Sequence, residues 1–231
     1  MVIDLNADLG EGVTDDAGLL AVVSSANVAC GFHAGDEATM RAVCETAVER
    51  GVVVGAQVSY ADRAGFGRRP VEVAAEVLAQ WVAEQVSVLS AVAVSCGTSV
   101  AYVKPHGALY NRVVDDADQA AAVVAGSGRL PVLGLPGSAI LALAEFSGRR
   151  SVPEGFPDRG YTREGRLLPR DQPGALITDP DAVAANAVRL ARAGSVASVC
   201  VHGDSAGAVD TAAAVRRELV AAGFTIGPFT E

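Results

Sequence analysis

The chain has 231 residues, of which 50% are hydrophobic and 5% are aromatic. This length and apolar content suffice for one large buried core, and we expect a single domain over residues 1–231, although two small domains would also fit the length. The net charge of -9, with only 18 Lys and Arg residues, argues against nucleic acid and membranes as partners, because either surface would call for a clustered basic face.

The first residues and the cysteines bear on the cellular compartment. The opening MVIDLN lacks a basic segment followed by an apolar one, and charged or polar residues interrupt every apolar stretch before it reaches about 18 residues. The four cysteines are scattered without a metal-type pair spacing, which favours reduced thiols over a disulfide framework. We therefore expect a cytoplasmic protein.

Short β-branched runs alternate with helical stretches along the chain, which is typical of βα units around a parallel sheet. In chain order, strands are predicted at residues 2–5, 26–29, 52–56, 101–103, 132–134, 175–177 and 198–201, with a weaker candidate at 151–153. Apolar residues at helical spacing predict helices packed on this sheet within residues 40–48, 77–82 and 183–191.

Capping signals support the predicted helices. Asp179 followed by Pro180 resembles an N-cap with proline at the first helical position, and Gly194 would end that helix. Similar signals occur at Ser138 and Gly51. No low-complexity segment or Gly/Ser linker divides the chain. A closed or nearly closed β/α barrel is therefore the simplest architecture.

Unusual polar residues cluster directly after the predicted strands. The clusters are Asn6, Asp8 and Glu11; His33 and Asp36; residues 57–69; Lys104, His106 and Asn111; residues 154–170; and His202 and Asp204. In a β/α barrel these positions share the C-terminal rim, where such enzymes build their active sites. All three histidines of the chain lie there beside carboxylates and a lysine, which favours a catalytic site over isolated structural histidines.

Each cluster also has a simpler structural interpretation. Asp36 and Asp204 precede helices, and either could be an N-cap worth about 1 kcal/mol. Lys104 could be a solvated surface lysine, whereas a buried ammonium at a strand end would need a carboxylate or a substrate oxygen. The arginines of GFGRRP and EGFPDRGY suit carboxylate or phosphate oxygens, but surface ion pairs would leave the same sequence.

Five segments carry a specific resemblance to a known family. They are DLNADLGEG at residues 4–12, ANVACGFHAGD at 26–36, GFGRR at 65–69, YVKPHGALYN at 102–111 and VHGD at 201–204. These segments resemble, in the same order, the signatures of the LamB/YcsF family, which comprises the A subunits of 5-oxoprolinase. EGFPDRGY followed by GRLLPR is similar to that family's EVFADR and G-x-L-x-PR segments, so the resemblance covers nearly the whole chain.

The resemblance implies an α/β fold, a variant (β/α)7 barrel related to polysaccharide deacetylase barrels. It also implies an ATP-dependent 5-oxoprolinase, a hydrolase in which the partner B and C subunits act with this chain to convert 5-oxo-L-proline to L-glutamate, ATP being hydrolysed to ADP and phosphate. ATP would be a co-substrate, and a hard divalent cation could accompany the nucleotide. Because an unstrained amide is a poor electrophile, phosphorylation of its oxygen would account for the need for ATP.

One position departs from the family pattern. The family usually has GAH where this chain reads GAQ, which places Gln57 at the histidine position. Glutamine is a poor ligand for a zinc-like ion and cannot act as a general base. We therefore assign no metal ligand and expect no tightly bound transition metal, although Asp8, His33 and His106 could still form a site.

The expected roles follow from side-chain chemistry. Asp8 and His33 are candidates for positioning or deprotonating water, and Lys104 and His106 for stabilising charge on the opening amide or its phosphate. Glu154 and Asp158 would orient those cations. The predicted substrate-binding residues are Asn6, Glu11, Asp36, Gln57, Arg68, Asn111, Arg159, Arg170, His202 and Asp204, with Arg159 or Arg170 holding the substrate carboxylate.

Two other functional classes stay open. A stand-alone metal-dependent deacetylase or amidohydrolase would need bound metal and would work without ATP. A non-catalytic component that delivers substrate would tolerate the loss of its candidate acid and base groups.

Overall fold

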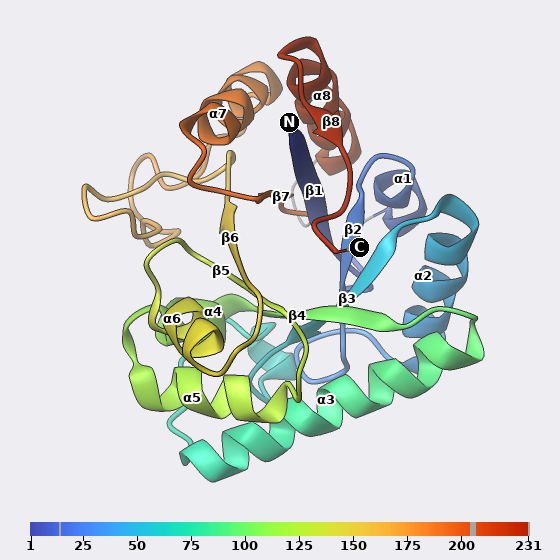
Figure 1. Cartoon of the computed structure of the whole chain (residues 1–231), viewed down its shortest axis with the longest axis vertical. Helices are drawn as coiled ribbons and strands as arrows, with labels where there is room; N and C mark the ends of the chain where they lie inside the picture. Colours follow the sequence, from blue (N-terminus) through green and yellow to red (C-terminus); the bar gives the residue numbers. More distant parts are fainter. Residues whose placement is uncertain (14, 204–206, 231) are drawn as a thin grey trace.

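The computed structural model describes residues 1–13, 15–203 and 207–230. Seven parallel strands close into a barrel, because the first strand pairs with both the second and the seventh (Figure 1). The barrel strands are β1 (Val2–Leu9), β2 (Ser25–Ala29), β3 (Val53–Val58), β4 (Val100–Pro105), β5 (Val132–Gly134), β6 (Ser151–Gly155) and β7 (Ser198–Val201). A short strand β8 (Thr225–Ile226) runs parallel to the start of β1. The predicted variant (β/α)7 barrel is confirmed.

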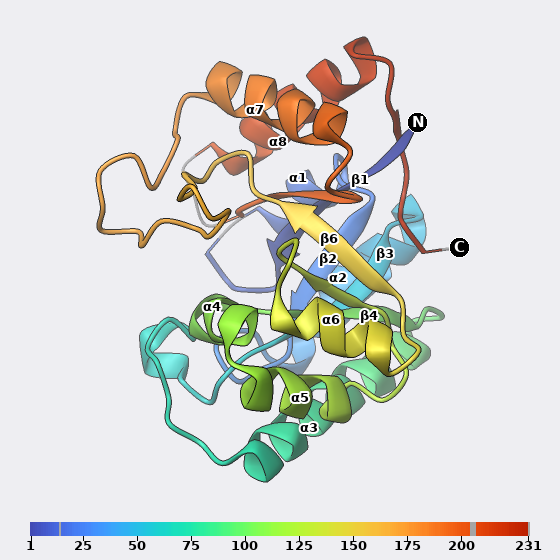
Figure 2. The same ribbon diagram turned by 60° about the vertical axis from the view of Figure 1, so that its left-hand side comes forward.

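Helices in the connections surround the barrel. They are α1 (Asp16–Leu20), α2 (Glu37–Arg50), α3 (Ala75–Ser95), α4 (Gly107–Asp115), α5 (Ala117–Gly126), α6 (Ala139–Phe146), α7 (Pro180–Ala193) and α8 (Ala208–Ala221), with a 3-10 turn η1 (Arg63–Gly65) before α3. Helices α7 and α8 pack together on one side, and α3 and α5 pack together on the opposite side (Figures 1 and 2). The connection between β6 and α7, residues 156–179, projects away from the barrel in both views.

One strand prediction is wrong. Residues 175–177 belong to the β6–α7 connection, where Leu176 forms an isolated antiparallel bridge with Arg159. The three consecutive apolar residues resembled a strand in sequence, but Leu176 is 47% exposed and the Ala175 carbonyl accepts a hydrogen bond from Arg159 Nε instead of pairing in the barrel. The weaker candidate at 151–153 is the barrel strand β6, whose signal was reduced by Pro153, a residue without a backbone N–H.

The helix boundaries follow the capping signals. Asp179 accepts a hydrogen bond from the Ala182 N–H, and α7 ends at Gly194 in the left-handed conformation. Gly51 ends α2 in the same way. Ser138 occupies the N-cap of α6, but its side chain makes no capping hydrogen bond.

Apolar side chains fill the N-terminal end of the barrel. Tyr102, Leu133, Val152 and Phe229 form one buried cluster there, with the rings of Tyr102 and Phe229 edge to face at 5.0 Å between centroids. Gly55 on β3 makes room for this packing, because a Cβ at that position would overlap the Tyr102 ring. Because this apolar cluster fills the N-terminal end, the polar side chains lie at the C-terminal end of the barrel.

Helix α3 is long and apolar enough to cross a membrane by length and composition alone, with a mean hydropathy of 1.5. It packs against α5, β3 and β4, and its Leu78, Val82 and Leu89 are fully buried. Packing in the helical layer therefore accounts for part of its apolar character.

Candidate active site

Strand β1 sends a column of polar side chains into the barrel. Because side chains alternate along a strand, Asp4, Asn6 and Asp8 share one side, while Leu5 and Ala7 on the other side join the apolar core beneath the helices. All three polar side chains are buried. Branched apolar residues usually fill a β/α barrel, so a buried polar column indicates a functional site.

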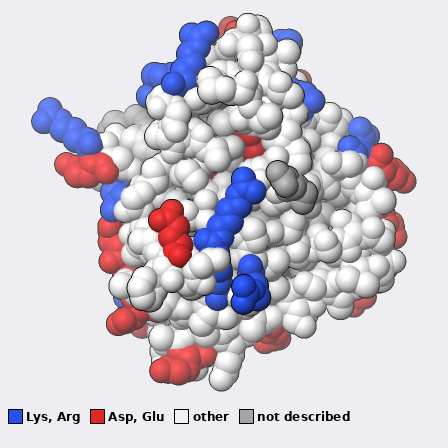
Figure 3. Space-filling view, viewed as in Figure 1, with Lys and Arg blue, Asp and Glu red and all other residues white. Residues whose placement is uncertain are grey.

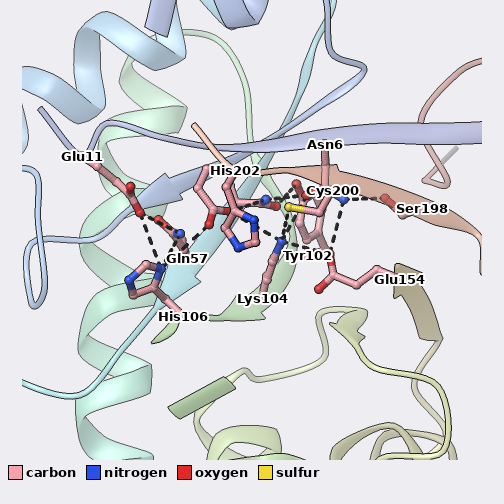
Figure 4. Close-up of polar contacts among 12 residues, drawn as sticks. Asn6, Glu11, Gln57, Tyr102, Lys104, His106, Glu154, Ser198, Cys200 and His202 are labelled. Atoms are coloured by element: carbon pink, nitrogen blue, oxygen red, sulfur yellow. Dashed lines mark hydrogen bonds and ion pairs between the residues drawn. The ribbon is translucent and has the colours of Figure 1, made fainter. Parts of the chain in front are cut away.

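Lys104, at the C-terminal end of β4, lies at the centre of this site (Figure 4). Its Nζ lies 2.9 Å from Glu154 Oε2 and 3.5 Å from Asp8 Oδ1. It also donates to Asn6 Oδ1 at 3.2 Å and to Cys200 Sγ at 3.0 Å. Burial alone would lower the pKa of Lys104, but Asp8 and its other neighbours raise it well above the usual value. Lys104 is therefore a buried ammonium.

Asp8 is the ionised partner of Lys104. Burial would raise the pKa of Asp8, but the Lys104 ammonium brings it well below its usual range. Asn27 Nδ2 donates to Asp8 Oδ1 at 2.9 Å and to Asn6 Oδ1 at 2.7 Å, and Asn27 Oδ1 accepts from the Tyr102 hydroxyl at 2.7 Å. These bonds satisfy the buried oxygens and hold Asp8 in one orientation.

Asp4 occupies a deeper layer of the barrel. Its carboxylate accepts hydrogen bonds from the hydroxyls of Ser24 and Ser25 at 2.7 Å and from that of Ser198. Burial, the largest influence, raises the pKa of Asp4 to about 6. The Ser198 hydroxyl also accepts from Asn6 Nδ2 at 2.6 Å, so Asp4 is linked to the Lys104 layer through Ser198 and Asn6.

A cavity of about 500 Å³ opens at this end of the barrel. Its charged lining consists of Lys104, Arg68, Arg159, Arg166 and Arg170, with the carboxylates Asp8 and Asp115. Its apolar wall includes Tyr110, Leu135, Phe156 and Leu168. Five cationic side chains against two carboxylates make the cavity complementary to an anionic ligand, although the whole chain is acidic.

The outer surface differs from the cavity in its charge pattern. On the face shown in Figure 3, basic and acidic side chains are interspersed and separated by wide uncharged areas. The predominance of cations in the cavity lining is therefore a local feature rather than part of a basic field over this face.

One wall of the cavity comes from the β6–α7 connection. Arg159 ties this wall together, because its Nε donates to the Ala175 carbonyl at 3.0 Å and its Nη2 to the Leu168 carbonyl at 2.6 Å. Arg159 thus uses two of its donors on the loop, while Arg170 lines the cavity from the same connection.

Asp158 and His202 form an acid–base pair on the rim. His202 Nδ1 lies 2.8 Å from Asp158 Oδ2, which also accepts the backbone N–H of His202 at 3.2 Å. Burial would raise the pKa of Asp158, but the neighbouring His202 lowers it, so Asp158 is an ionised partner. With Nδ1–H donating to this carboxylate, Nε2 is the imidazole nitrogen that can exchange a proton.

A third cluster adjoins Asp8, whose Oδ2 lies 3.9 Å from His106 Nδ1. Gln57 Nε2 lies 3.0 Å from Glu11 Oε1 and 2.9 Å from His106 Nδ1 (Figure 4). The ring of His33 stacks on that of His106 with centroids 4.0 Å apart. Burial, followed by the neighbouring His33, lowers the pKa of His106 to about 3, so this imidazole is neutral.

The structure brings most predicted site residues to one end of the barrel. Those lining the cavity are Asp8, Arg68, Lys104, His106, Asn111, Arg159, Arg170 and His202. Those touching that set through the contacts above are Asn6, Glu11, Gln57, Glu154 and Asp158. As expected for an extended segment that continues through Pro105, Lys104 and His106 face the same cavity.

Three predicted residues lie elsewhere or outside the description. Asp36 caps α2, accepting from the Thr39 N–H at 2.8 Å, and is absent from the described cavity lining, so its capping interpretation is confirmed. His33 is packed behind His106 rather than lining the cavity as described. Asp204 lies outside the described residues.

The interior polar residues that the sequence analysis does not predict include Asp4, Asn27, Tyr102 and Ser198. The available signal was the alternation of polar and apolar residues through VIDLNADL, which predicts a strand with one polar face. The predicted strand ends at residue 5, so that Asn6 and Asp8 fall after it, whereas β1 continues to Leu9 and carries both.

The chain is similar to known proteins over nearly its whole length. The model of the LamB/YcsF family matches residues 3–231. Over 249 aligned positions the chain is 56% identical to the 5-oxoprolinase A subunit of Streptomyces avermitilis, covering 99% of this chain and 100% of the relative. It is 51% identical to the protein of that name from Mycolicibacterium gilvum, with 99% of each chain covered.

Solved structures agree with the fold. A lactam utilization protein from Thermus thermophilus superposes with a TM-score of 0.93 at 36% identity, covering 99% of this chain and 100% of that one. The catalytic domain of a peptidoglycan N-acetylglucosamine deacetylase from Eubacterium rectale superposes with a TM-score of 0.56 at 13% identity, covering 99% and 88%. The second likeness concerns the barrel alone and confirms the predicted relation to deacetylase barrels.

Proposed function

Since the chain belongs to the LamB/YcsF family, we propose that it acts as the A subunit of an ATP-dependent 5-oxoprolinase, together with B and C subunits. Two relatives that are more than 50% identical to this chain, and are matched over their whole length, carry the name of that subunit. The observation in the molecule that supports the proposal best is the buried Lys104 ammonium, held between Asp8 and Glu154 in the lining of a cationic cavity.

The proposed reaction opens the five-membered lactam of 5-oxo-L-proline to L-glutamate. ATP transfers its γ-phosphoryl group to the amide oxygen, releasing ADP and making the carbonyl carbon more electrophilic. Water adds to that carbon, the C–N bond breaks, and the nitrogen takes up a proton to become the free amine. A second water hydrolyses the resulting acyl phosphate to the carboxylate and inorganic phosphate.

The cavity suits such a substrate in size, charge and shape. A volume of about 500 Å³ exceeds the needs of a single small ring and leaves room for a phosphoryl group. The apolar wall formed by Tyr110, Leu135 and Phe156 can pack on the ring methylenes. Arg68 and Arg170 present guanidinium groups, which bind carboxylate and phosphate oxygens in a planar, two-pronged geometry.

Lys104 would stabilise the negative charge that develops on the amide oxygen or its phosphate. Its ammonium is held in place by Asp8 and Glu154 before substrate arrives, so little reorganisation is needed during reaction. The surrounding protein excludes most water, since Lys104 is 2% exposed, and a fixed charge acts more strongly there than in solvent. Removing such a donor typically lowers turnover by about 10²- to 10³-fold.

His202 would transfer the protons. Asp158 holds its Nδ1–H, which fixes the tautomer and leaves Nε2 free of that bond, and the side chain lines the cavity. It can take a proton from the attacking water and return one to the departing nitrogen. His202 thus takes the acid–base role that the sequence analysis proposes for His33, because the described cavity lining includes His202 and not His33.

Reconstitution tests the proposal. Purified chain should release little or no glutamate from 5-oxoproline and ATP, and addition of the B and C subunits should restore glutamate release coupled to ADP formation. Glutamate production by the chain alone without ATP would instead favour a stand-alone amidohydrolase. A complex that keeps full turnover with the His202→Gln variant would favour a component that only delivers substrate.

A further inference from the structure

Glu11, His33 and His106 come together from three different connections of the barrel, following β1, β2 and β4. Each offers one ligand atom, and these atoms all lie within 4.8 Å of one another. Glu11 Oε1 lies 3.5 Å from His33 Nε2 and 3.5 Å from His106 Nδ1. All three side chains are buried, so no solvent competes for their lone pairs.

These separations match those around a small metal ion. Zinc binds imidazole nitrogen and carboxylate oxygen at about 2.0–2.2 Å with tetrahedral geometry, which puts neighbouring ligand atoms about 3.4 Å apart. Both Glu11-to-histidine separations are close to that value. We propose that Glu11, His33 and His106 bind a divalent first-row metal ion such as Zn²⁺.

His33 gives an independent reason to place a ligand here. It is 1% exposed, and neither ring nitrogen has a hydrogen-bond partner among the described residues. Leaving a buried polar group unpaired destabilises the folded state. Bonding of Nε2 to an ion held by Glu11 would remove much of that destabilisation.

His106 is already oriented as a metal ligand. Its Nε2–H donates to the Phe66 carbonyl at 3.1 Å, which leaves the Nδ1 lone pair facing Glu11 and His33. Ligating histidines almost always donate their second N–H to a carbonyl or a carboxylate in this way. Phe66 has a φ of 56°, and among the residues described it is the one non-glycine position with positive φ. A bulky residue in that conformation is strained, and such strain concentrates at ligand sites.

Gln57 can add a fourth ligand. Its Oε1 is buried without a hydrogen-bond partner among the described residues, and its Nε2 lies 3.0 Å from Glu11 Oε1 and 2.9 Å from His106 Nδ1. A half-turn of the amide would exchange the two atoms and direct the oxygen toward the ion. The sequence predicts no tightly bound transition metal, because Gln57 stands where the family usually has histidine. In the folded chain Glu11 lies beside His33 and His106 and can act as the third ligand.

Metal binding by the intact, tag-free chain tests the site without reference to catalysis, so its outcome is separate from that of the proposed reaction. Chelator-treated protein is titrated with Co²⁺, followed by visible absorption, and the bound Co²⁺ is then displaced with Zn²⁺. One equivalent should bind with micromolar or tighter affinity and the absorption of a four- or five-coordinate ion. The Glu11→Gln and His33→Ala variants should each bind at least about 100-fold more weakly, whereas Gln57→His should bind more tightly.

The His202→Ala variant is the matched control, since it removes a histidine from the same rim but not from this cluster, and it should bind Co²⁺ as the unaltered chain does. Circular dichroism of each metal-free variant checks folding, and two separate ligand variants keep the test valid if one of them fails to fold. Failure of the unaltered chain to bind one equivalent would overturn the proposal. Equal binding by folded Glu11→Gln or His33→Ala protein would do the same.

Discussion

Replacing Lys104 by Met should reduce stability and turnover together, for one electrostatic reason. The ammonium lies 2.9 Å from Glu154 and 3.5 Å from Asp8 inside the barrel, so its removal leaves two buried carboxylates without their cation. Breaking a buried ion pair from one side typically costs about 3–5 kcal/mol of unfolding free energy. Sequence position alone, one residue past a short predicted strand, would suggest almost no effect on folding.

A second substitution separates the two effects. The double variant Lys104→Met/Glu154→Gln also removes one of the two carboxylates that lost their cation. Its free energy of unfolding should therefore exceed that of Lys104→Met by at least about 1 kcal/mol. Turnover of the complex with the B and C subunits should stay about 10²- to 10³-fold below normal, because the charge facing the cavity is still missing. Urea denaturation and glutamate release are measured on the same samples. A Lys104→Met protein of unaltered stability, or a double variant within about threefold of normal turnover, would refute the reasoning.

Three further predictions concern the rim, the deep barrel and the turn behind the histidines. Asp158→Asn should lower turnover of the complex by about 10²- to 10⁴-fold, because His202 would no longer be held in its reactive tautomer. Turnover equal to that of the unaltered complex across the pH range would contradict this. Asp4 has a folded pKa of about 6 against about 3.9 when unfolded, so it favours the folded state in acid, and on the order of 2 kcal/mol should be lost as pH rises from 4 to 7; urea denaturation should show that dependence removed in Asp4→Asn. Gly67→Ala should destabilise the chain in thermal unfolding more than Gly51→Ala, since both have a φ of 67° but only the Cβ at Gly67 would approach His33 Cβ to 2.9 Å; equal losses would count against tight packing there.

Much of the architecture could be predicted because its signals are local. The N-cap at Asp179, the left-handed glycines at positions 51 and 194 and the β-branched runs report on backbone conformation within a few residues. Four of the five family motifs contribute residues to the described cavity lining, and the motif at residues 26–36 contributes none. The wrong strand was also local in origin, because an apolar run at 175–177 resembled a strand. The proline in β6 only weakened a strand signal that was correct.

What the sequence by itself determined, then, is the order of βα units and the end of the barrel at which polar side chains gather. Only the closed barrel decided which of them meet. Lys104 lies 98 positions from Asn6 and Asn6 lies 148 from Glu154, yet all three touch because β1 pairs with both β2 and β7 and brings distant strands around one axis. The same closure buried Lys104 between carboxylates, left Asp36 as a helix cap, and placed Glu11 against two histidines. Such contacts depend on strand register and ring closure, which no short-range pattern in the sequence reports.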